Sequence, residues 1–358
     1  MTIFLALFLA APVFSQDGEG TGVSKIVSLK NILVNFLEER ELRGVDTNYI
    51  GAPKKKWAVF ANSYLSSMDF DLRSRFVDNA DDGNPYQLSR AVIDLHSKTQ
   101  KQVSLGLYYM GYGLSYAFNL GKGYERDLTL TLYSSPVGGE YRYHSTNRIK
   151  GSIDMKDLYG EDLMLKMNGT EAQMDNFILN VYYVFNPKKF SYASAMSYSK
   201  IQKKSAGSVI AGLTLNRTRL KSSDPWLSYV MGTVNRIKIQ QFAFGAGYGY
   251  NWVPAKNLTI HISEIPMLLI TTKSATKMKS ENDDGWSTMQ KEGQKKLFGS
   301  RTHVSFSHML RFSSSYSWND RYLAGISTYY NYFRVGKHSS YYASTSDWNL
   351  RFFFAYRF

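Results

Sequence analysis

The sequence predicts an all-β protein: a transmembrane antiparallel up-and-down β-barrel of about 12 strands, preceded by a short N-terminal helical segment. Three observations lead to this fold class. Apolar and polar residues alternate along runs of about ten residues or more, the length that a tilted strand needs to cross an outer membrane. Aromatic residues make up 15% of the chain and recur near the ends of these runs, as in the aromatic girdles of such barrels. The connections between runs differ in length, with short turns and long loops.

Residues 1–15 are predicted to be a signal peptide. The run MTIFLALFLAAPVFS is apolar over about the length of a signal-peptide core, and it ends on small Ser15 with Val13 two residues before it. The run is too short for a membrane-spanning helix, which needs about 20 apolar residues. A buried N-terminal strand or helix is the alternative, but residues 16–22 turn polar and glycine-rich at once. Any later passage through a membrane must therefore be made by strands.

Residues 16–56 are predicted to form a periplasmic helix and a linker. Within this segment Ile26, Leu29 and Leu33 recur at helical spacing. The linker that follows, GVDTNYIGAPKKKW at 44–57, carries a basic run. We expect the helix either to cap one end of the barrel or to lie in its lumen.

Residues 57–358 are predicted to form the barrel. The run 241–252 shows the pattern best, because one face is apolar throughout: Phe242, Phe244, Ala246, Tyr248, Tyr250 and Trp252. The opposite face carries small and polar residues: Gln241, Ala243, Gly245, Gly247, Gly249 and Asn251. The same alternation recurs in DLTLTLYSS at 127–135 and THVSFSHMLRFSSSY at 302–316. The three glycines therefore mark one face of a strand, since a phosphate-binding loop would lead into a helix.

Thirteen runs qualify as strands: 57–69, 88–98, 102–118, 127–136, 139–146, 173–186, 190–200, 207–219, 237–253, 257–271, 300–316, 321–335 and 347–358. Bacterial barrels have an even number of strands. The run 88–98 is the weakest candidate, because LSRAVIDLHSK carries charge on both faces. Twelve strands are therefore expected.

Short turns are expected at NPKK (186–189), VPAKN (253–257) and SWNDR (317–321), and long loops at 146–172 and 273–300. If the last strand ends in the periplasm, counting backward places the last two turns on the periplasmic side, as the length rule requires. The same count places NPKK on the outside, against that rule. The strand order between about 147 and 236 is therefore left open.

The C-terminal run DWNLRFFFAYRF has an apolar residue at every second position and ends on an aromatic residue. This pattern resembles the C-terminal assembly signal of bacterial outer-membrane proteins. The residues concerned are Leu350, Phe352, Phe354, Tyr356 and Phe358. The resemblance implies recognition by the barrel assembly machinery, and the run is expected to pair with the first strand near Trp57.

Three segments, VDTNYIGAPKKKW (45–57), YGLSYAFNLG (112–121) and IQKKSAGSVIAG (201–212), resemble the domain-of-unknown-function 4421 family of Bacteroidetes outer-membrane β-barrel proteins. The resemblance implies a barrel in the outer membrane of a Gram-negative bacterium. The family is uncharacterised, so no activity and no catalytic residues are implied.

Two histidine–serine pairs lie two residues apart, and each pair therefore shares one face of its strand: His303 with Ser305, and His261 with Ser263. Histidine beside serine is the arrangement of a base and a nucleophile in acyl transfer. No third group that would orient the histidine is evident, and both pairs are expected to face the lumen. The leading interpretation assigns no catalytic residue, and a lipase or lipid A deacylase is kept as the alternative.

Composition restricts the ligands further. The chain has no cysteine, which excludes disulfides and cysteine-bound metals. The calcium-like loop 78–84 has Ala80 at a ligand position and lacks the closing glutamate. We expect no cofactor and no metal. The formal net charge of +14 favours an anionic partner, and the leader makes lipopolysaccharide or an anionic solute more fitting than nucleic acid. The side chains expected to line the lumen are Gln241, Asn251, Arg311, Arg351 and Arg357.

Twelve strands fall between the eight that side chains nearly fill and the sixteen that leave a water channel, so a narrow or plugged lumen is expected. The sequence thus favours an outer-membrane barrel that acts as a narrow channel, a small-solute transporter or a surface structural protein in contact with outer-membrane lipid. One alternative is the acyl-transfer enzyme, and another is a secreted soluble β-sandwich that binds lipid or glycan. The oligomeric state is not determined by the sequence.

Deletion of Phe358 is expected to impair membrane assembly more than any activity of the assembled protein, because the terminal aromatic residue is part of the assembly signal. The measurement is the yield of heat-modifiable barrel in membrane fractions. Normal yield of the truncated chain would contradict the assignment.

Overall fold

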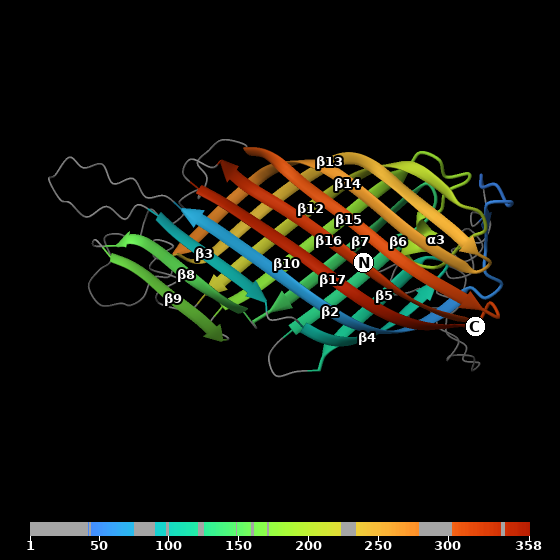
Figure 1. Cartoon of the computed structure of the whole chain (residues 1–358), viewed down its shortest axis with the longest axis horizontal. Coiled ribbons are helices and arrows are strands. Elements are labelled where there is room, and N and C mark those ends of the chain that lie inside the picture. Colours follow the sequence, from blue (N-terminus) through green and yellow to red (C-terminus); the bar gives the residue numbers. More distant parts are fainter. Residues whose placement is uncertain are drawn as a thin grey trace, which may run out of the picture.

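The computed structural model describes residues 42, 44–74, 90–97, 100–120, 125–147, 149–158, 161–169, 172–222, 234–278, 303–337 and 341–358 (Figure 1). Three predicted features lie outside these residues: the signal peptide at 1–15, the helix that contains Ile26, Leu29 and Leu33, and the loop 78–84. Within the described part of the chain, no helix is both long enough and apolar enough to span a membrane.

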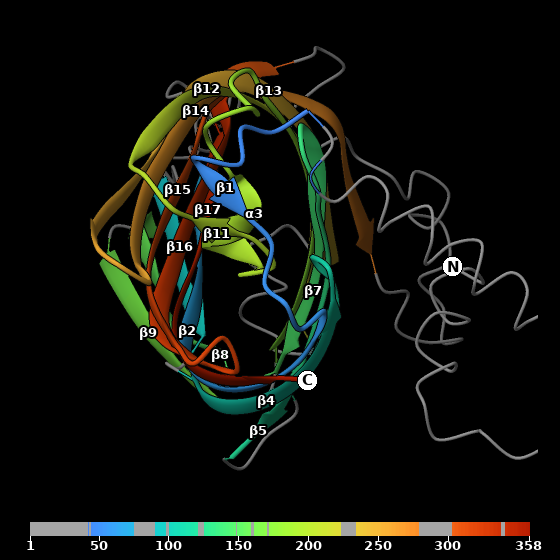
Figure 2. The same ribbon diagram turned by 90° about the vertical axis from the view of Figure 1, so that its right-hand side faces the viewer.

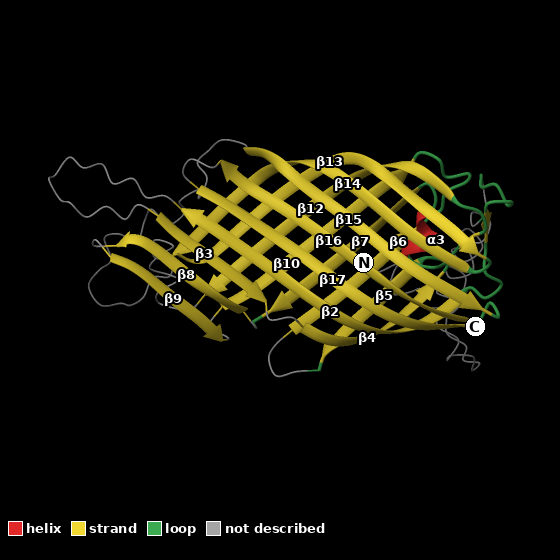
Figure 3. Ribbon diagram, in the orientation of Figure 1, coloured by secondary structure: helices red, strands yellow, loops and turns green. Residues whose placement is uncertain are grey.

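A closed ring of twelve antiparallel strands forms the body of the protein, which confirms the predicted barrel (Figures 1 and 3). In order around the ring the strands are β2 (Trp57–Ser74), β4 (Gln100–Tyr109), β5 (Tyr112–Asn119), β6 (Glu125–Tyr133), β7 (Val137–Thr146), β10 (Ala172–Val184), β12 (Ala206–Ser222), β13 (Val234–Ala255), β14 (Leu258–Met278), β15 (His303–Trp318), β16 (Tyr322–Lys337) and β17 (Tyr341–Arg357). Strand β17 closes the ring by pairing with β2 over its whole length, from Tyr341 opposite Ser74 to Arg357 opposite Ala58. A single closed ring is not a two-sheet sandwich, so the soluble sandwich alternative is wrong.

The outer face of the ring is largely apolar. On β13 the exposed side chains are Phe244, Tyr248, Tyr250 and Trp252, and their neighbours on β12 and β14 include Leu213 and Ile262. A polar contact lies within the described part of this surface, where His308 Nδ1 is 3.2 Å from Glu264 Oε1. Because apolar side chains in water would be unfavourable over such an area, this face is suited to lipid.

Short turns gather at one end of the ring, which we call the turn end. They connect β4 to β5 at Met110–Gly111, β13 to β14 at Lys256–Asn257, and β15 to β16 at 319–321. Gly111 has a φ of 95° and a Cβ there would overlap the carbonyl oxygen of Tyr133, so only glycine fits. Two of these turns are the predicted VPAKN and SWNDR turns.

At the opposite end, the loop end, three further strands extend the wall: β3 (Arg90–Ser97), β8 (Ile149–Leu158) and β9 (Glu161–Gly169). Strand β2 pairs with β4 as far as Ser66 and with β3 from Asp69 onward, so β3 takes over as its neighbour above the shorter strand β4. An apolar cluster joins these strands to the opposite wall. Its members are Met68, Phe70, Leu72, Ile93, Leu95, Ile149, Ile153, Met155, Ala172, Met174, Leu220, Ile239 and Ala343. We call this cluster the cap, because it fills the interior at the loop end.

At the turn end, residues 185–205 leave the wall between β10 and β12 and fold into the ring. We call this segment the plug. It contains the helix α3 (Tyr192–Met196) and the short strand β11 (Ile201–Gln202), which pairs with β1 (Ile50–Gly51). Figure 2, viewed from this end, shows β1, β11 and α3 within the outline of the ring.

Several strand assignments need correction. The run 190–200 is not a strand but the plug helix and its flanks, and the run 102–118 is two strands, β4 and β5. The run 88–98 contains β3, which lies outside the ring of twelve. The predicted long loop at 146–172 contains the hairpin β8–β9. With these changes NPKK begins the plug at the turn end, and the conflict in strand order disappears.

Leu213→Arg should lower the free energy of unfolding by about 2–4 kcal/mol, because Leu213 projects from the middle of the lipid-facing wall between Val181 and Phe244. Leu120→Arg is the matched control, since exposed Leu120 follows β5 at the loop end, where the cost should be about 0–1 kcal/mol. Denaturant unfolding in lipid vesicles measures both. Equal losses at the two positions would contradict a membrane-facing wall.

Candidate functional site

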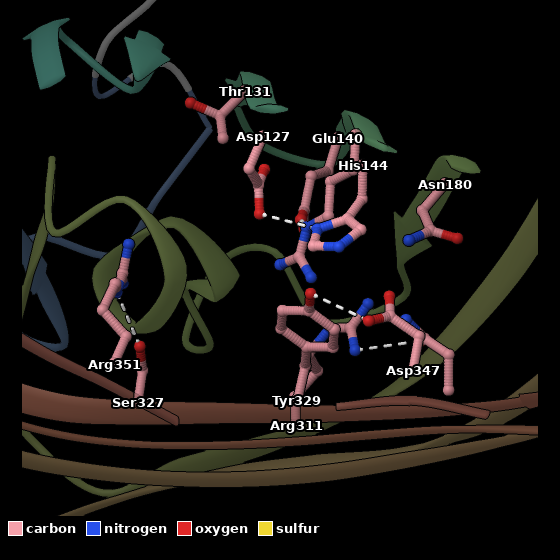
Figure 4. A network of polar contacts seen from close by, with 12 residues as sticks. Asp127, Thr131, Glu140, His144, Asn180, Arg311, Ser327, Tyr329, Asp347 and Arg351 are labelled. Carbon is pink, nitrogen blue, oxygen red and sulfur yellow. Dashed lines mark hydrogen bonds and ion pairs between the residues drawn. The ribbon is translucent and has the colours of Figure 1, made fainter. Parts of the chain in front are cut away.

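Between the cap and the plug, the lumen narrows to a polar cavity that we call the chamber. Its volume is about 50 Å³, which holds about four water molecules. The wall combines charged, aromatic and hydroxyl side chains: Tyr64, Tyr108, Ser115, Ala117, Asp127, Thr129, Thr131, Tyr133, Glu140, Arg142, Met196, Arg311, Phe312, Ser327, Thr328, Tyr329, Asn349 and Arg351. Figure 4 shows the polar side chains converging from facing strands.

The strand register brings the chamber residues to one level. Arg311 on β15 lies opposite Tyr329 on β16, which in turn lies opposite Asn349 on β17. Two residues further along, Ser327 lies opposite Arg351. Since side chains two residues apart share a face, Arg311, Tyr329 and Arg351 all project inward from neighbouring strands.

Two arginines lie against one aromatic ring in the chamber. Arg142 reaches across the lumen from β7, and its Cζ is 3.4 Å from the centroid of the Tyr329 ring. The Cζ of Arg311 is 5.1 Å from the same centroid. Both distances are within the range of a cation–π contact. The lumen is therefore bridged by side chains at this level.

Three carboxylates in or beside the chamber have partners of their own. Glu140 forms an ion pair with Arg142 and accepts a hydrogen bond of 2.7 Å from the hydroxyl of Tyr133. Asp127 lies 3.4 Å from His144 Nδ1. The Tyr329 hydroxyl donates to Asp347 Oδ1 over 3.4 Å.

Arg351 and Arg357 connect the last strand to the plug through Tyr198. Arg351 Nη2 donates to the Tyr198 hydroxyl over 3.1 Å, and its Nε donates to Ser327 Oγ over 2.8 Å (Figure 4 shows the second bond). Arg357 Nη2 donates to the Tyr198 carbonyl over 2.7 Å. Burial raises the pKa of Tyr198, so its hydroxyl stays neutral as the partner of Arg351.

The plug is also held by two amide side chains. Gln202 Oε1 accepts from the Ser191 backbone N–H over 3.0 Å and from Asn251 Nδ2 over 2.9 Å. Its Nε2 donates to the carbonyls of Lys189 and Lys204. Asn251 Nδ2 donates in addition to the carbonyl of Ser191 over 2.9 Å.

Apolar contacts complete the seat of the plug. Phe190 and Tyr192 are buried in a cluster with Ile178, Ile210 and other inward side chains of β10 to β16. The plug therefore combines a hydrophobic anchor with a set of buried hydrogen bonds.

The predicted pair His261 and Ser263 lies beside the plug, and the structure supplies the third group that the sequence did not reveal. Asn251 uses its amide nitrogen as a donor to the plug, so its Oδ1 accepts from His261 Nδ1 over 2.7 Å. The other ring nitrogen, Nε2, then accepts from Ser263 Oγ over 2.9 Å. Asn251 is thus an orienting group that was not evident from the sequence. The exposed fractions of Asn251, His261 and Ser263 are only 0%, 0% and 2%.

The remaining predicted residues are placed apart from one another. Ser305 donates to the carbonyl of Arg334, while the side chain of His303 lies outside the described structure. Gln241 is buried and accepts from Asn216 Nδ2 over 2.9 Å. Within the described residues, no group of three or more metal-binding side chains is present.

The predicted assembly residues lie on β17 and, for Phe358, directly after it. Phe352, Phe354, Tyr356 and Phe358 project from the outer face, and Leu350 is partly buried. The Phe358 backbone N–H donates to the carbonyl of Trp57 over 3.1 Å, which extends the closing seam to the last residue.

A family model, described as "Domain of unknown function (DUF4421)", matches residues 44–358. The chain belongs to the DUF4421 family. The match to the family covers every strand of the ring. The search of curated proteins found no match.

Solved structures that resemble this DUF4421 protein are bacterial outer-membrane barrels of low sequence identity. The outer membrane protease OmpT of Escherichia coli is 8% identical, with a TM-score of 0.38 over 86% of this chain and 97% of that one. The translocator domain of the autotransporter NalP of Neisseria meningitidis is 9% identical, with a TM-score of 0.36 over 94% and 98% of the two chains. OprG of Pseudomonas aeruginosa is 11% identical, with a TM-score of 0.29 over 85% and 97%.

Several chamber and plug residues escaped the sequence reasoning, among them Arg142, Tyr329 and Gln202. For Arg142 a signal was present. In EYRYHST at 140–146, the polar residues Glu140, Arg142 and His144 alternate with tyrosines, so they share one face. Gln202 gave no such signal, because its partners come from the folded plug.

Gln202→Leu should loosen the plug of this DUF4421 protein, since it removes buried hydrogen bonds worth about 1 kcal/mol each. We expect backbone amide exchange in residues 190–200 to rise about tenfold or more. Gln173→Leu is the matched control, because Gln173 lies near the loop end of β10 and bonds to Ser145 and Asp175. An unchanged exchange rate in the Gln202 variant would show that these bonds do not hold the plug.

Proposed function

We propose that this protein is an integral outer-membrane barrel of a Gram-negative bacterium that acts as a narrow, gated channel for small solutes. The plug is the gate, and the chamber lies on the solute path. The observation that carries this proposal is the plug itself, a segment seated within the ring whose described contacts with the wall are hydrogen bonds, a cation–π contact and buried side chains that include Phe190, Tyr192 and Tyr198.

The energetics of the plug support a closed resting state that can open. Each buried hydrogen bond contributes about 0.5–1.5 kcal/mol, and burial of an aromatic side chain contributes about 1.5–3 kcal/mol. The sum is on the order of ten kcal/mol, so the closed state is strongly favoured and a populated open state needs a ligand or partner that stabilises it. A ligand or partner that favours the open state then controls passage.

The strand lengths support a route past the cap. The cap lies beneath β3, β8 and β9, whereas β5 and β6 have only 8 and 9 residues and end below it. Asp127, near the loop end of β6, already lines the chamber. Solutes would reach the chamber from the loop end over these short strands and leave past the plug.

The outer surface supports the proposed location. Apolar side chains cover the wall, and rings such as Tyr316, Trp318 and Tyr322 stack near the turn end. With the predicted leader and the aromatic C-terminal strand, these features favour insertion by the barrel assembly machinery. We place the turn end in the periplasm, and we infer contact with lipopolysaccharide at the loop end.

Conductance in planar bilayers tests the gate. We expect the wild type to open rarely and a variant with residues 190–200 replaced by a short glycine–serine linker to conduct steadily. Gln202→Leu should open more often than the wild type, and Gln173→Leu should not. If the linker variant assembles as a heat-modifiable barrel and shows no conductance, the channel function is rejected.

A second candidate function is acyl transfer at Ser263, favoured by the hydrogen-bond chain through His261 to Asn251. It requires the plug to move, because Ser263 does not line the chamber and is buried.

Hydrolysis of phospholipid and lipid A acyl chains by the wild type, Ser263→Ala and Ser305→Ala tests this candidate. On the channel proposal none of the three is active. Activity that Ser263→Ala abolishes and Ser305→Ala retains would establish the enzyme instead.

A further inference from the structure

Two chamber arginines have only neutral partners among the described residues. Arg311 Nη1 donates to Asn331 Oδ1 over 3.1 Å and to the carbonyl of Leu310 over 3.3 Å. Arg351 donates to hydroxyl groups, those of Ser327 and Tyr198. Within the described structure, neither has a carboxylate within ion-pair distance. Because removing a guanidinium from water is unfavourable, a buried arginine normally has an anionic partner.

Two N–H donors in the chamber are left without an acceptor. Arg311 Nη2 and Arg142 Nη1 are both buried and have no hydrogen-bond partner in the described part of the chain. Arg311 as a whole is only 3% exposed, and both residues line the chamber. Buried donors are almost always paired in folded proteins. Two unpaired guanidinium donors beside one cavity therefore indicate an acceptor that enters from outside.

The chamber carboxylates limit the charge of that acceptor. Asp127, Glu140 and Asp347 have the partners described above, and among the described residues none of them lies within ion-pair distance of Arg311 or Arg351. Counted by formal charge, however, they balance the three arginines. A doubly charged ion would be repelled by these carboxylates, whereas a single negative charge is suited to the two arginines without a counter-ion.

Geometry and size narrow the ligand class further. A guanidinium presents planar, paired donors that match a carboxylate, and the contacts with Tyr329 hold Arg142 and Arg311 in place before a ligand arrives. The chamber volume of about 50 Å³ admits only a few heavy atoms. We propose that the chamber binds a small monovalent oxyanion, a short-chain carboxylate, held by Arg311 and Arg142 with Arg351 nearby. This inference rests on the proposed function, since it names the solute of the same lumen.

Isothermal titration of the purified full-length barrel in detergent with sodium acetate tests the inference. We expect saturable binding at about one site, weakened at least tenfold in Arg311→Gln. Arg351→Gln should also weaken it. Arg73→Gln is the matched control, because Arg73 is exposed near the loop end of β2. This variant should bind acetate with the affinity of the wild type. Sodium chloride at equal ionic strength corrects for screening, and sodium sulfate should bind more weakly than acetate.

Heat-modifiable migration in gels first establishes that each variant folds. If Arg311→Gln does not fold, Arg351→Gln is the variant used for the test. Acetate should also protect the wild type against thermal unfolding more than it protects the variant. Absence of saturable acetate binding, or equal affinity in both chamber variants and the wild type, overturns the inference. Because the titration needs no transport, binding without conductance would reject the channel and keep the site. Conductance without acetate binding would keep the channel and reject the site.

Discussion

A closed ring of twelve strands is wider than its own inward side chains can fill, and yet narrower than an open water channel. The rest of the structure follows from this constraint. At the loop end the space is filled by apolar side chains from opposite walls, and at the turn end it is filled by a segment of the chain itself. Only the middle level is left to polar side chains, which bridge the lumen from β7 to β16 through Arg142 and Tyr329.

The fold was largely predictable because lipid and lumen impose opposite demands on successive residues. The alternation in β13 and the aromatic face of β17 both correspond to strands, and β17 closes on β2 as expected. The plug was misread as a strand for a physical reason. In FSYASAMSYSK at 190–200, the larger side chains are separated by two or four residues, so on a strand they would share one face: Phe190, Tyr192, Met196 and Tyr198. Enclosed in the lumen, the segment has no lipid side, so that spacing places no constraint on its backbone.

The candidate site was predictable only in part. The inward positions of Arg311 and Arg351 follow from alternation along one strand, but the contact of Arg311 and Arg142 with one ring depends on how far the walls stand apart. The orienting residue of His261 could not be read from the turn alone. A regular hairpin that turns at Lys256–Asn257 would pair Asn251 with Ile262, and a register shift between Trp252 and Ala255 places Asn251 opposite His261 instead.

The first and last strands of the ring each contribute to every level of the interior. Strand β2 supplies Phe70 to the cap and Phe60 to the apolar cluster near the plug, and β17 supplies Ala343 and Phe353 to the same two clusters. Tyr64 of β2 and Arg351 of β17 also line the chamber. No layer is complete until residues nearly 300 positions apart meet. Folding of this chain is therefore concentrated in one late, slow step, and partly synthesised chains must be kept from aggregating until the last strand arrives.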